Sequence, residues 1–170
     1  MMHIILVGLT LFMGACVGWS IGANDAANSL GTAVGSRVLT LRQVIILISI
    51  FGFLGAFLQG SYVTNTIGKG IVPMNQLPRD LSIYLAFVSS FAACSWVALA
   101  TQWKMPISTS HSIVGAVAGA GLAIGAPVRW RMLLDIFICW IFTPIGAAAL
   151  GYFFIGFLKI CSTESFPINI

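Results

Sequence analysis

Charged residues are scarce in this chain, at 7% of its 170 residues, whereas an average soluble domain carries about a quarter. This scarcity excludes an ordinary water-soluble domain. Hydrophobic residues make up 59% of the chain and gather in windows without charge. Five windows are each long enough to cross a hydrocarbon core, which needs about 20 apolar residues in a helix. They cover residues 1–24, 43–68, 81–103, 105–128 and 136–158.

Acidic residues and cysteines are also few, which narrows the possible chemistry. Four acidic residues stand against eight basic ones, and the basic residues lie in the connections between windows, where they suit lipid head groups and not a nucleic acid. The four cysteines show neither metal-ligand spacing nor a disulfide framework, so we interpret them as packing residues. The sequence therefore predicts one all-α transmembrane domain over residues 1–170, in a multi-pass protein of the plasma membrane.

A first polar motif, residues 22–29, interrupts the apolar sequence at the end of the first window. It is Gly-Ala-Asn-Asp-Ala-Ala-Asn-Ser, and it contains Asn24, Asp25 and Asn28. A carboxylate at membrane depth costs a few kcal/mol or more unless it meets a cation, a donor or water, so we expect Asp25 to face a cavity. Gly22 and the three polar side chains favour turns and caps, which predicts a broken first helix. Broken helices in membranes are natural ion and substrate sites.

A second polar motif, Pro106-Ile107-Ser108-Thr109-Ser110-His111, opens the fourth window. Proline followed by hydroxyls predicts a helix N-terminus, whose first backbone N–H groups are free and bind anions. The three hydroxyls add uncharged donors, which suit a transporter that must also release its substrate. His111 is either a polar residue at the helix start or a group that donates to an oxyanion or responds to protonation. The window itself either spans the membrane or re-enters it.

Together, in this order and about 80 residues apart, the two motifs resemble those of the inorganic phosphate transporter (Pit-type) family. The resemblance covers about residues 11–125. It implies transport of phosphate coupled to sodium or a proton, through two inverted repeats with the site at their interface, and we expect no cofactor besides the coupling ion. By position it implies a cation site at Asn24, Asp25 and Asn28, with sodium on Asn24 and Asp25. It implies phosphate binding by Asp25, Asn28, Ser108, Thr109, Ser110 and His111.

One departure from the family is large. Its members usually contain two copies of each motif, and this chain has one of each. We therefore expect a second repeat to complete the site, either from an antiparallel homodimer or from a second half-length chain. The basic residues support insertion in both orientations, because five spans place four of them on each side of the membrane. If the fourth segment re-enters, the count becomes five against three.

Other functions stay open at this stage. Ser108 or Ser110 beside His111 could form the nucleophile pair of an intramembrane hydrolase, but three consecutive hydroxyls fit an anion better, so we expect no enzyme. The chain could instead be a membrane assembly subunit without a site of its own, or a passive channel. The motifs are equally compatible with sulfate or another tetrahedral oxyanion as substrate.

Overall fold

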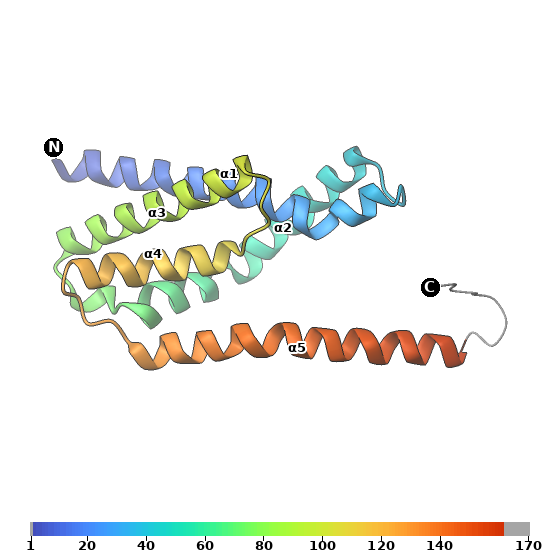
Figure 1. The fold of residues 1–170 in the computed structure, drawn as a ribbon. Helices are drawn as coiled ribbons and strands as arrows, with labels where there is room; N and C mark the ends of the chain where they lie inside the picture. The colour runs from blue at the N-terminus through green and yellow to red at the C-terminus, as the bar shows by residue number, and fades with distance from the viewer. Residues whose placement is uncertain (1, 162–170) are drawn as a thin grey trace. The chain divides into compact units, whose positions relative to one another are not determined.

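A computed structural model describes residues 2–161 of the chain, and all regular structure in this part is helical (Figure 1). The long helices are α1 (Met2–Gly35), α2 (Leu41–Asn65), α3 (Arg79–Gln102), α4 (Thr109–Ala123) and α5 (Trp130–Cys161). A π-helical turn, η1 (Thr66–Ile71), and a 3-10 turn, η2 (Met74–Gln76), connect α2 to α3. The prediction of an all-α protein is confirmed. The helices form two compact units, α1 to α4 in one and α5 in the other.

Within the described residues, four helices are long and apolar enough to cross a membrane: α1, α2 with η1, α3 and α5. The fourth window, expected either to span the membrane or to re-enter it, contains only the 15-residue α4. A helix of this length measures about 22 Å, against a hydrocarbon core of about 30 Å. The helix is shorter than the window because residues 105–108 precede it and Gly125, at φ 69°, follows its end. All five predicted segments are helical, and four of these helices are of spanning length.

The first helix is not broken, contrary to the prediction. α1 continues for 34 residues through the first polar motif, and Gly22 has a helical backbone. The polar side chains do not turn back onto the backbone of α1. Asn28 donates to Asn24, and Asn24 donates to residues of α3 and of the turn after it. Because the competing hydrogen bonds are made to other groups, the α1 backbone keeps its helical ladder.

In the first unit, α3 lies between α1 and α4 (Figure 1). The buried residues of α3 recur every three or four positions and form one stripe: Leu85, Ser89, Ala93, Val97 and Ala100. The starts of α1 and α3 meet where His3 Nδ1 lies 3.4 Å from Asp80 Oδ1. α4 runs back toward this end, where the N–H of Arg129 donates to the carbonyl of Ile71 at 2.9 Å. These contacts make α1 and α3 parallel and α4 antiparallel to both.

The connection between α2 and α3 provides the surface on which α4 packs. Helix continues from α2 through η1 to Ile71, and Ile71 and Val72 are fully buried. A Cβ atom built on Gly121 of α4 would lie 2.7 Å from Val72 Cγ2 and 3.3 Å from Val128 Cγ2. Both neighbours are β-branched and hold few rotamers, so neither side chain yields easily. Gly121 is therefore required for the close approach of α4.

Replacing Gly121 with alanine is expected to lower the free energy of unfolding by about 1–3 kcal/mol, because the added methyl group overpacks this contact. Thermal unfolding in detergent, followed by circular dichroism, measures the effect. Gly119→Ala is the matched control, since a Cβ at Gly119 meets nothing within 4 Å and alanine favours helix. Equal shifts of the two variants would show that α4 does not pack on Val72.

Candidate functional site

The two polar motifs meet where α1 passes the turn between α3 and α4 (Figure 1). Thr109 Oγ1, in the first turn of α4, donates a hydrogen bond of 3.0 Å to Asp25 Oδ2 of α1. Thr109 is 8% exposed, and Asp25 is half-buried. A hydrogen bond to an ionised group is roughly twice as strong as a neutral one, so this contact stabilises a carboxylate partly removed from water. The expectation that Asp25 and the second polar motif lie together is confirmed, while their binding roles stay predictions.

Asn24 holds α1 against α3 and the turn that follows it. Its side chain is buried, at 5% exposed. The amide Nδ2 donates to Thr101 Oγ1 at 3.1 Å and to the carbonyl of Met105 at 3.4 Å. The amide Oδ1 accepts from Asn28 Nδ2 at 2.8 Å. An amide oxygen has two lone pairs, so Asn24 Oδ1 keeps one for a further donor or a cation.

Thr101 is a polar partner that the sequence analysis missed. It lies in the last turn of α3, and its own hydroxyl donates to the carbonyl of Val97 at 2.8 Å. Its oxygen then accepts from Asn24. A single hydroxyl near the end of an apolar helix is an ordinary feature of a sequence. The one signal that could have linked Thr101 to the site was its position eight residues before Thr109.

The start of α4 follows the second polar motif closely. Ser108 is the N-cap residue, with φ −83° and ψ 114°, and its hydroxyl accepts from the backbone N–H of His111 at 3.3 Å. The His111 Nδ1 atom is also within hydrogen-bonding distance of the Ser108 hydroxyl. The predicted helix N-terminus is therefore confirmed, with Pro106 and Ile107 just before it. The contact of His111 with Ser108 fits the interpretation of His111 as a polar residue at the helix start.

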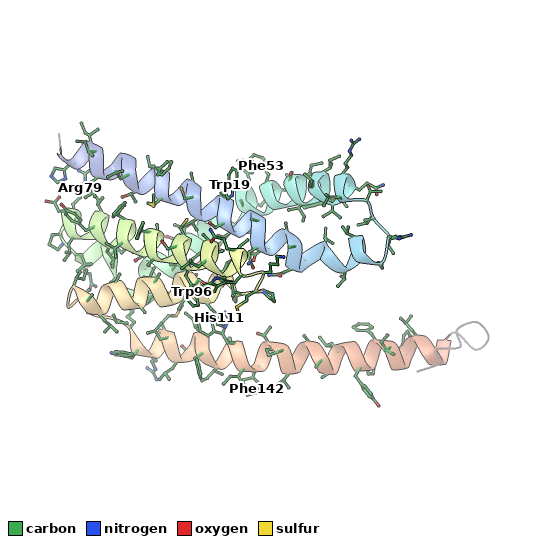
Figure 2. All side chains as sticks on the ribbon, turned by 45° about the horizontal axis from the view of Figure 1, so that its top comes forward. Trp19, Phe53, Arg79, Trp96, His111 and Phe142 are labelled. Atoms are coloured by element: carbon green, nitrogen blue, oxygen red, sulfur yellow. The ribbon has the colours of Figure 1, made fainter. Side chains whose placement is uncertain are left out.

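The three hydroxyls of the motif do not converge within this chain. Ser108 lines a cavity of about 520 Å³ between α3 and α4, together with Trp96 and His111. Figure 2 shows Trp96 and His111 close to each other on these helices. Ser110 is exposed, and among the described residues no hydrogen bond joins Ser108 or Ser110 to α1. In the part of the chain that the structure describes, Thr109 is the hydroxyl of the motif that hydrogen-bonds to Asp25.

Within the described range, Asp25 makes no ion pair with Lys104, the basic residue in the turn between α3 and α4. Neither α1 nor α4 contains lysine or arginine, so Asp25 has no cationic neighbour on either helix. An anion placed about 4 Å from Asp25 would be repelled by roughly 1–4 kcal/mol, depending on the local dielectric. The aligned N–H groups of α4 offset part of this repulsion, and a cation beside Asp25 would remove it. The arrangement therefore places a carboxylate, which attracts cations, beside a helix N-terminus, which attracts anions.

Comparison with known proteins gives consistent results. Residues 21–169 match the phosphate transporter family. A candidate phosphate permease of Pyrococcus furiosus is 37% identical over 147 residues, which are 85% of this chain and 36% of that protein. The chloroplastic inorganic phosphate transporter 2-1 of Arabidopsis thaliana is 39% identical over 147 residues, 84% of this chain and 25% of its own length.

One solved structure also aligns, a sodium-dependent phosphate transporter, with a TM-score of 0.86 and 35% identity. The alignment covers 92% of this chain and 40% of the other. The chain thus spans between 25% and 40% of the length of these relatives.

Proposed function

The chain belongs to the phosphate transporter family, and from this premise we propose that it is one repeat of a sodium-coupled transporter of inorganic phosphate in the plasma membrane. The observation that carries the proposal is the hydrogen bond of 3.0 Å from Thr109 to Asp25. It joins the N-terminus of α4, a feature that binds anions, to a carboxylate that attracts cations. The sodium-dependent phosphate transporter with a TM-score of 0.86 favours sodium over a proton.

The binding roles follow from the chemistry of each group. Asp25 supplies the charge and Asn24 an amide oxygen for sodium, with Asn28 placed to support either ion. Neutral donors of the second polar motif bind the phosphate: Ser108, Thr109, Ser110 and His111, with the N–H groups of the first turn. Sodium beside Asp25 lowers the repulsion that the anion meets, so the two ions bind better together than alone.

The position of α4 supports a re-entrant segment. At about 22 Å the helix is too short to cross, and we propose that it begins inside the bilayer at the site. α1 continues ten residues past Asp25 to Gly35, about 15 Å, which is half of a hydrocarbon core of about 30 Å. Arg37 follows at the α1–α2 turn, where a basic residue suits the lipid head groups.

A second repeat is needed to cover this site. Asn28, Ser108 and Ser110 are exposed in the single chain, and Asp25 is only half-buried, although a carboxylate is expensive to leave toward lipid. We propose that an antiparallel repeat packs over them and contributes its own copies of the two motifs. Another copy of this chain is one source of such a repeat.

Reconstitution of the purified chain alone into liposomes tests the proposal. We expect radiolabelled phosphate to accumulate at least about tenfold faster with an inward sodium gradient than with an equal potassium gradient, and excess sulfate not to compete. Equal uptake rates in the sodium and potassium gradients would contradict the coupling. Absence of uptake would exclude the homodimer. If the chain shows neither uptake nor sodium-dependent binding of phosphate, the proposed function itself is overturned.

A further inference from the structure

We propose that the Thr109 hydroxyl is the coupling switch of this site: it donates to Asp25 before sodium binds, and to phosphate afterwards. This inference rests on the proposed function and adds an order of binding to it. Sodium enters first, and its arrival frees the donor that phosphate needs. Thr109 is then a positioning residue for coupling as well as a donor to the anion.

The first step of the argument is that a hydroxyl has one proton. It can donate to one acceptor at a time, whereas its oxygen can accept from others. In the structure this proton is directed to Asp25 Oδ2, across 3.0 Å. While that bond exists, Thr109 has no proton for an oxyanion. The acceptor is a carboxylate, so the bond is charge-assisted, and an incoming anion must compete with it.

Burial makes Thr109 different from its two neighbours. Thr109 is 8% exposed, whereas Ser108 and Ser110 are exposed and can exchange their donors with water. Ser108 is also engaged as the cap of α4. Among the three hydroxyls of the motif, Thr109 is thus the one whose donor is held by the cation-binding carboxylate.

Sodium makes the hydrogen bond from Thr109 to Asp25 unnecessary for stabilising the carboxylate. A full positive charge next to Asp25 stabilises the carboxylate in place of the hydroxyl proton. The Thr109 O–H is then free to rotate toward the first turn of α4, where an anion can accept it. This step needs a change of one torsion angle and no backbone movement. An anion that arrives before sodium meets both the charge of Asp25 and a missing donor.

Equilibrium binding of radioactive sodium and radiolabelled phosphate to the full chain in detergent tests the switch. In the unchanged chain, sodium should raise phosphate affinity at least about tenfold. In Thr109→Val, which keeps the shape and removes the hydroxyl, sodium should bind about tenfold more tightly because the carboxylate has lost its donor. Phosphate should bind about tenfold more weakly, and Thr109→Ser should restore both affinities. Thr10→Val is the matched control, because the Thr10 hydroxyl donates within α1 to Leu6.

The outcomes separate this inference from the proposed function. If Thr109→Val weakens phosphate binding and leaves sodium affinity unchanged, Thr109 is a phosphate ligand only and the switch is wrong. If sodium and phosphate both bind more weakly, Thr109 supports the cation directly and the switch is again wrong. If the unchanged chain shows no sodium-dependent phosphate binding, the proposed function fails together with the inference. Circular dichroism of each variant confirms that the helices are formed.

Discussion

Sodium-dependent phosphate uptake is expected to fall at least about 100-fold when Asp25 is replaced by asparagine. The variant keeps the size of the side chain and an oxygen that can accept from Thr109, so it removes little besides the charge. A unit charge about 4 Å away contributes roughly 4 kcal/mol at an effective dielectric constant of 20, which is enough to abolish cation binding. Uptake into liposomes measures the loss, and thermal unfolding shows whether the fold is retained.

Asp80→Asn provides the matched control for this prediction. Asp80 is an exposed carboxylate at the start of α3, and it lies 3.4 Å from His3. Exposed ion pairs contribute little, so uptake should change less than about twofold. Equal losses in the two variants would mean that acidic charge acts through folding or insertion, and not through a cation at Asp25.

The second large effect is expected for Asn24→Leu. Leucine is similar in size but cannot replace the hydrogen bonds that Asn24 makes with Thr101, Met105 and Asn28. Each buried polar group left without a partner costs about 1–3 kcal/mol. We expect a loss of about 2–4 kcal/mol in the free energy of unfolding, and no uptake, because the turn before α4 is no longer held against α1. Thermal unfolding in detergent and uptake assays check the two expectations separately.

Asn75→Leu is the control for the loss of an amide. Asn75 is exposed in η2, away from the polar motifs, and surface substitutions of this kind usually change stability by less than about 0.5 kcal/mol. If Asn24→Leu unfolds like the unchanged chain, apolar packing alone holds α1 against α3. The hydrogen bonds of Asn24 would then contribute little to stability.

Local features were predicted well from the sequence. Charge-free windows located the helices of spanning length, because the bilayer imposes a composition on every span. The Ser108 cap was predictable because its chemistry involves residues three positions apart. The meeting of Asp25 with the second polar motif was implied by the resemblance to the transporter family, and it agrees with the need of a carboxylate in apolar surroundings for a donor or a cation.

Features that depend on the register between helices were not predictable. The broken first helix was inferred by assuming that Asn24 and Asn28 bond to nearby backbone, as such residues often do. In the structure the Asn24 amide donates 77 and 81 residues along the chain, to Thr101 and Met105. Which residue of α3 faces Asn24 depends on packing that one sequence does not display. Hydropathy likewise shows an apolar window around α4 but not where the helix within it ends.

The uninterrupted course of α1 limits how sodium can be coordinated. In a regular helix the carbonyls beside Asp25 already accept the N–H groups four residues later, so they are poor ligands compared with those of an unwound segment. The oxygen ligands that this chain offers are then side-chain atoms, chiefly those of Asp25 and Asn24. Under the proposed function, the remaining sodium ligands are water or atoms of the opposing repeat. If that repeat is another copy of this chain, sodium affinity decreases on dilution of the protein, as the two copies dissociate.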